Sequence, residues 1–85
     1  MKKILETACL LERETAQAYL KEQLSFPDWY GGNLDALYDC LTVLGETEIV
    51  FTGTEESPYF RRVWRVFRAA ARENPDLRVT REEEF

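Results

Sequence analysis

The chain contains no histidine, and its only cysteines are Cys9 and Cys40. A structural zinc site needs four such ligands at characteristic spacings, so the sequence predicts none. It also lacks a G-x-S-x-G motif, a glycine-rich phosphate loop and a cluster of metal-ligating side chains. We therefore expect a protein that is not an enzyme and holds no metal and no cofactor. Both thiols are expected to be reduced, although a disulfide between them stays open.

Long hydrophobic runs are absent as well. Lys2, Lys3 and Glu6 place charges at the N-terminus before any apolar stretch develops, so neither a signal peptide nor a membrane span is predicted. These features favour a cytoplasmic protein with no membrane partner. The length of 85 residues and the hydrophobic fraction of 45% predict a single globular domain over residues 1–85.

The net charge of −5 is unevenly distributed along the chain. Residues 1–60 contain four Lys and Arg against eleven Asp and Glu, whereas residues 61–85 contain seven against five. An acidic first part disfavours direct binding of nucleic acid and favours a basic protein partner, because opposite charges steer two surfaces together. The alternative is that the charge only keeps the protein in solution.

Strand and helix patterns alternate along the chain. We expect strands at 2–6, 48–52 and 77–80, and helices at 12–24, 34–44 and from 58 to the Asn74-Pro75 pair. Residues 25–32 are expected to form a loop, since Pro27 and the Gly31-Gly32 pair disfavour helix there. Strands separated by helices predict an α/β fold with a parallel sheet that is covered by helices on at least one face.

The second helix has two distinct faces. Its leucines recur at core spacing, whereas Asp35, Tyr38, Asp39 and Thr42 share the opposite face. Two carboxylates four residues apart repel each other mildly, which suggests that a partner needs them; the alternative is an ordinary solvated helix face. In the loop before this helix, Trp29 and Tyr30 are candidate contact residues, because they lie beside glycines.

The third helix has an arginine stripe, formed by Arg61, Arg65, Arg68 and Arg72. Such a stripe could follow a nucleic-acid backbone. The alternative, which the net acidity favours, is that the arginines cover apolar surface or pair with acidic neighbours. The spacing of Trp64 and Phe67 on the same helix predicts that both belong to the core.

The segment PDWYGGNLDALYDCLT at residues 27–42 closely resembles the signature of the barstar family of ribonuclease inhibitors. The resemblance implies a two-layer α/β fold with a three-stranded parallel sheet packed with helices. It also implies an intracellular inhibitor of a basic, barnase-type ribonuclease of the kind that microbes secrete, monomeric before complex formation. The acidic second helix and the preceding loop would plug the active site of the nuclease.

The resemblance also assigns contact roles to single residues. Asp39 corresponds to the central acidic anchor, which reaches arginines and the catalytic histidine of the nuclease, and Asp35 corresponds to a second anchor. The remaining expected partner contacts are Trp29, Gly31, Asn33, Leu34, Tyr38 and Thr42, with Glu46 at the rim.

The chain departs from the family pattern in four places. Tyr38 and Leu44 replace tryptophans, Ala69 replaces a glutamate, and the connection before the third helix is shorter. An interaction domain that holds another basic protein, or a different nuclease, through the same surface is therefore the alternative.

Overall fold

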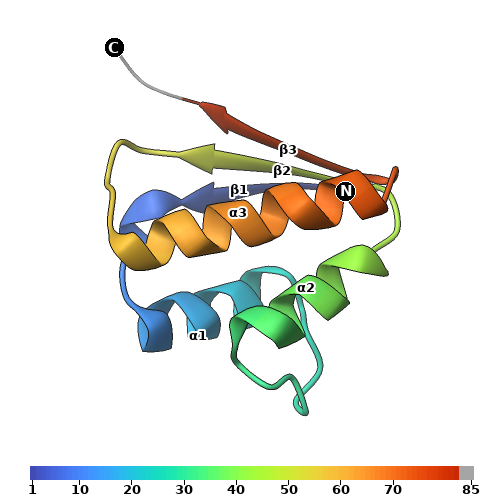
Figure 1. The fold of residues 1–85 in the computed structure, drawn as a ribbon, viewed down its shortest axis with the longest axis horizontal. Helices are drawn as coiled ribbons and strands as arrows, with labels where there is room; N and C mark the ends of the chain where they lie inside the picture. Colours follow the sequence, from blue (N-terminus) through green and yellow to red (C-terminus); the bar gives the residue numbers. More distant parts are fainter. Residues whose placement is uncertain (83–85) are drawn as a thin grey trace.

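The computed structural model describes residues 1–82, so the last three residues of the expected domain lie outside the described part. The α/β prediction is confirmed. The elements are β1 (Lys2–Glu6), the 3₁₀ helix η1 (Thr7–Cys9), α1 (Arg13–Gln23), α2 (Leu34–Thr42), β2 (Thr47–Thr52), α3 (Pro58–Glu73) and β3 (Leu77–Glu82). Figure 1 shows the three strands side by side and the three α-helices gathered on one side of them.

The sheet is parallel throughout and has the strand order β1-β2-β3. Successive side chains of a strand point to opposite faces, so one face can be buried while the other meets solvent. Leu5 of β1 and its neighbour Phe51 of β2 are fully buried against the helices. Ile4 is 55% exposed, which shows that the opposite face of the sheet is not covered at that edge. The fold therefore has two layers.

Phe51 joins the sheet to α3. Its ring lies 5.0 Å from the ring of Phe67, 5.4 Å from that of Trp64 and 5.9 Å from that of Phe60, always edge to face. Such pairs contribute about 0.5–1.5 kcal/mol each beyond the area they bury. The prediction that Phe67 belongs to the core is confirmed, whereas Trp64 is only half-buried and packs at the core margin.

Ser57 and Pro58 begin α3 as predicted. The Ser57 Oγ accepts a hydrogen bond from the Phe60 amide at 3.0 Å, and its own hydroxyl donates to the Leu11 carbonyl at 2.8 Å. A proline at the first helical position loses no hydrogen bond that the helix would have made. One serine therefore both caps α3 and ties it to the segment before α1.

Asn74 explains where α2 ends. Its side chain, in a residue that is only 6% exposed, donates to the Leu41 carbonyl at 3.0 Å and to the Leu44 carbonyl at 2.9 Å. The prediction that α2 continues to Leu44 is wrong by two residues, because these carbonyls bond to Asn74 instead of to a further helical turn. Two other differences are η1, which was not predicted, and β3, which continues beyond Thr80 to Glu82.

Candidate functional site

Two local features fix the orientation of α2. The Asn33 Oδ1 accepts a hydrogen bond from the Ala36 amide at 2.8 Å, as expected of an N-cap residue. Leu37 and Leu41 are fully buried in the core. The face opposite these leucines is therefore held toward solvent before any partner arrives.

That face is acidic. Asp35 and Asp39 are exposed on it, and Thr42 lies beside them with its hydroxyl donating to the Asp39 carbonyl at 2.9 Å. Within residues 1–82, neither carboxylate accepts a hydrogen bond or forms an ion pair. Tyr38 is half-buried at the edge of the same face and packs against the core. We call Asp35, Asp39, Thr42 and the neighbouring Val43 the acidic strip.

The two adjacent aromatic residues of the loop before α2, Trp29 and Tyr30, differ in burial. Trp29 is 81% exposed, whereas Tyr30 is 9% exposed. Tyr30 lies 4.7 Å from the ring of Phe26, and its hydroxyl donates to the Gln17 Oε1. Burial raises the pKa of the Tyr30 phenol well above its usual range. Tyr30 therefore anchors the loop and is mostly buried, although it also lines the hollow described next, and its contact role stays a prediction. Trp29 is exposed and free to meet a partner.

A shallow apolar hollow of about 250 Å³ lies between this loop and the acidic strip. Trp29 and Gly31 line it from the loop, and Asp39, Cys40 and Val43 line it from α2 and the residue that follows it. Burial, followed by the charge of Asp39, raises the pKa of the Cys40 thiol, so the thiol stays protonated. We call this space the Trp29 hollow.

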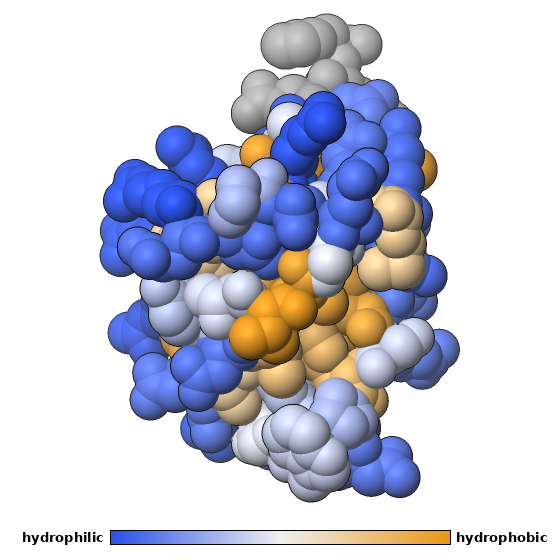
Figure 2. All heavy atoms as spheres, turned by 90° about the vertical axis from the view of Figure 1, so that its right-hand side faces the viewer, coloured by the Kyte–Doolittle hydropathy of each residue, from blue (hydrophilic) through white to orange (hydrophobic). Residues whose placement is uncertain are grey.

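Val43 is a residue of this surface that the sequence analysis missed. It is 81% exposed, as Trp29 is, so two large apolar side chains of this surface face solvent. Figure 2 shows apolar side chains gathered in the middle of the face toward which α2 runs, with hydrophilic side chains around them. The spacing of Val43, four residues after Asp39 and eight after Asp35, was a signal for it, because this interval returns to the same helix face.

Asn33, Leu34 and Asp35 border a second hollow, of about 250 Å³, at the other side of the strip. Leu34 is half-buried and Asn33 is exposed. Residues from the starts of α1 and α3, Arg13, Tyr59 and Arg62, complete its lining. We call this space the arginine hollow.

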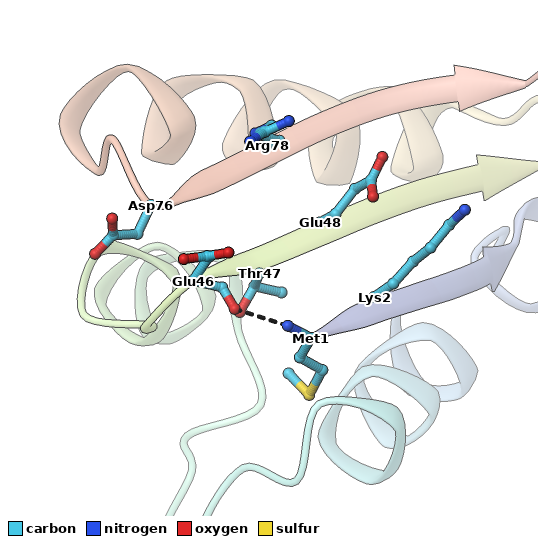
Figure 3. Close-up of a pocket in the computed structure, with 7 residues that line it drawn as sticks. All are labelled: Met1, Lys2, Glu46, Thr47, Glu48, Asp76 and Arg78. Carbon is cyan, nitrogen blue, oxygen red and sulfur yellow. Dashed lines mark hydrogen bonds between the residues drawn. The ribbon is translucent and has the colours of Figure 1, made fainter.

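Glu46 lines neither of the two hollows beside the acidic strip. It lines a different hollow, of about 240 Å³, where the three strands begin, together with Met1 and Asp76 (Figure 3). Its backbone carbonyl accepts a hydrogen bond from the N-terminal amine at 3.0 Å. The structure therefore brings together the predicted contacts of the loop and α2, but not Glu46.

The remaining candidate groups are the arginines of α3 and the two cysteines. Arg61 lies 3.9 Å from Glu56, and both side chains are exposed. Cys9 and Cys40 are free thiols, as expected. Over residues 1–82, no group of three side chains suited to a metal gathers at one place. In the same part of the chain, no helix is both long and apolar enough to cross a membrane.

The fold and the acidic strip define a class: a small α/β domain that presents exposed carboxylates on a preformed helix beside an exposed tryptophan. The chain belongs to the barstar family, since the family model, described as Barstar (barnase inhibitor), matches residues 4–83. The resemblance seen in the sequence is thereby confirmed.

A Bacillus subtilis (strain 168) protein with the name "Putative ribonuclease inhibitor YrdF" is similar over a shorter stretch. It is 74% identical over 23 residues, which are 27% of this chain and 25% of that protein. The match thus spans about a quarter of the length of this curated relative.

Proposed function

We propose that this protein inhibits a basic, barnase-type ribonuclease. It would insert the acidic strip, together with the loop before α2 that carries Trp29, into the active cleft of the nuclease. The observation that carries the proposal is the pair of exposed carboxylates, Asp35 and Asp39, which have no partner within residues 1–82. Family membership and the name of the Bacillus relative support it.

The proposed inhibition is electrostatic and steric. A ribonuclease cleft is lined with cations that bind RNA phosphates, and Asp35 and Asp39 would occupy the places of two phosphates. Hydrogen bonds between carboxylates and arginine are among the strongest that proteins form, and they gain further when water is excluded. Because α2 is already ordered, binding would cost little conformational entropy. No bond is made or broken, so the inhibitor would leave the complex unchanged.

The Trp29 hollow suits a planar cationic side chain. Its walls are mostly apolar and include the exposed Trp29, while the Asp39 carboxylate lies at its border. An imidazolium or guanidinium group placed there would meet an aromatic face and a negative charge at once. A catalytic histidine or arginine of the nuclease, held in this hollow, could no longer act on RNA.

The test is a titration of the protein into an RNA-cleavage assay with a barnase-type ribonuclease. We expect stoichiometric inhibition by the wild type. Asp39→Ala should weaken it by roughly 10-fold to 150-fold, as for the loss of hydrogen bonds to a charged group. Glu82→Ala is the matched control, because it removes the same charge from an exposed residue of β3, away from α2. Equal inhibition by wild type and Asp39→Ala would contradict the proposed site.

The alternative is an interaction domain that holds another basic protein through the same surface. Leu44 favours it, since this side chain packs against the core and offers less aromatic area than the tryptophan of the family pattern. Tight binding to the ribonuclease without loss of RNA cleavage, or no binding at all, would favour this alternative.

A further inference from the structure

The arginine hollow is unusual because it places two cations beside an acidic anchor. It lies where the starts of three helices meet: Arg13 belongs to α1, Asp35 to α2, and Tyr59 and Arg62 to α3. Arg13, Asp35 and Arg62 are all exposed. They converge on one hollow of about 250 Å³ although their elements are far apart in the sequence.

None of these three charges is neutralised within the part of the chain that the structure describes. The ion pairs of residues 1–82 are Arg61 with Glu56 and Arg81 with Glu56, so neither Arg13 nor Arg62 has a carboxylate within 4.0 Å there. Asp35 likewise has no arginine within that distance. The hollow thus presents two positive groups and one negative group that are all available to a partner.

Tyr59 adds a hydrogen-bond donor to the same hollow. The Gln17 Nε2 donates to the Tyr59 hydroxyl oxygen at 2.8 Å, and the Gln17 Oε1 accepts the hydroxyl of Tyr30. Gln17 is only 6% exposed, so this chain of hydrogen bonds is held in place by packing. Because Tyr59 accepts from Gln17, its own proton remains available for another acceptor.

We propose that the arginine hollow receives a carboxylate side chain of the target ribonuclease, next to the basic side chain that pairs with Asp35. This inference rests on the proposed function and adds a requirement for the partner: an aspartate or glutamate at the rim of its cationic cleft. Two guanidinium groups and a phenol are suitable donors for a carboxylate, and arginine binds it with two parallel hydrogen bonds.

The pattern of charges would select the partner as well as attract it. A cleft with cations alone would place one of them against Arg13 or Arg62 and lose affinity through repulsion. A cleft with an acid in the matching place would satisfy all three groups. The arginine hollow therefore discriminates among basic ribonucleases.

Net charge alone predicts that replacing an arginine by glutamate strengthens binding, whereas the proposal predicts weaker binding at the arginine hollow. This difference makes the proposal testable. The inhibitor has a net charge of −5 and its proposed partner is basic, so replacing any arginine by glutamate should strengthen their overall attraction. At the arginine hollow the same replacement should weaken binding, because it would place a carboxylate against a carboxylate.

The experiment measures the dissociation constants of wild type, Arg62→Glu and Arg68→Glu for a barnase-type ribonuclease with an acidic residue at its cleft rim. Arg68 is the matched control: it is exposed on the same helix, does not line the hollow, and gives the same change of charge. We expect Arg62→Glu to weaken binding by at least about tenfold, the loss expected for hydrogen bonds to a charged group. Arg68→Glu should leave affinity unchanged or raise it, and melting curves should show both variants folded.

Each outcome has a separate meaning. If both variants bind as tightly as the wild type or more tightly, the arginine hollow receives no carboxylate, and the proposed function is unaffected. If Arg13→Glu repeats the loss seen with Arg62→Glu, the two arginines act on one group. If the wild type itself neither binds nor inhibits the ribonuclease, the proposed function fails and this inference fails with it.

Discussion

Asn74→Ala tests whether one buried amide holds the end of the proposed binding helix. The Asn74 side chain makes three hydrogen bonds: its Nδ2 donates to the carbonyls of Leu41 and Leu44, and its Oδ1 accepts from the Asp76 amide at 3.0 Å. The net contribution of a typical hydrogen bond is about 1 kcal/mol, so three of them give about 3 kcal/mol. The Leu41 carbonyl also accepts from the Leu44 amide, which places the expected loss at roughly 2–3 kcal/mol.

This loss should be visible in thermal unfolding followed by circular dichroism. For a domain of this size, each kcal/mol shifts the melting temperature by roughly 4–8 °C, so Asn74→Ala should melt roughly 10–20 °C below the wild type. Glu73→Ala is the control, since it changes the exposed neighbour and should stay within about 0.5 kcal/mol of the wild type. A loss below about 0.5 kcal/mol for Asn74→Ala would show that the α2 carbonyls find other partners and that the reasoning is wrong.

Three further predictions concern the loop and the sheet end. Trp29→Ala should weaken ribonuclease binding by at least about tenfold with little change in melting temperature, because the side chain is exposed; isothermal titration checks it. Tyr30 has a pKa raised by burial, so its contribution to stability is complete below pH of about 10 and is lost as the pH rises further. Tyr30→Phe should therefore be less stable at pH 7 but should lose less stability between pH of about 10 and 12 than the wild type does, as measured by urea unfolding. Gly53→Ala should destabilise the fold by about 1–3 kcal/mol, because Gly53 has a φ of 113° and an added methyl group would overlap Thr7; a melting curve near that of the wild type would contradict this.

The sequence predicted the helices and strands well because their core residues repeat at regular intervals. The leucines of α2 and the apolar run of β2 are local signals that need no knowledge of the rest of the chain. The end of α2 was predicted less well. It depends on Asn74, a residue 30 positions after Leu44, whose role in the sequence looked like that of an ordinary helix stop.

In the loop of the candidate site, too, a residue far away in the sequence decides which side chain is buried. Trp29 and Tyr30 are adjacent aromatic residues beside glycines, and no periodicity distinguishes them in a loop. Tyr30 is buried because Gln17 of α1 supplies the partner that its hydroxyl needs, and this pairing exists only after the chain has folded. Trp29 has no such partner within residues 1–82 and stays exposed.

The acidic strip is bordered by two hollows of different chemistry, which would fix the orientation of a partner as well as attract it. On one side, next to Asp39, lies the mostly apolar Trp29 hollow; on the other side, next to Asp35, lies the arginine hollow with its two cations. A partner that rotates on the strip by half a turn would place its carboxylate in the mostly apolar Trp29 hollow and its planar cation among the arginines. The carboxylate would lose its hydration without compensation, and the cation would meet like charges. The two carboxylates alone would attract many basic surfaces in several orientations. Under the proposed function, the different hollows at their two sides would favour a single orientation, which specific inhibition of one ribonuclease requires.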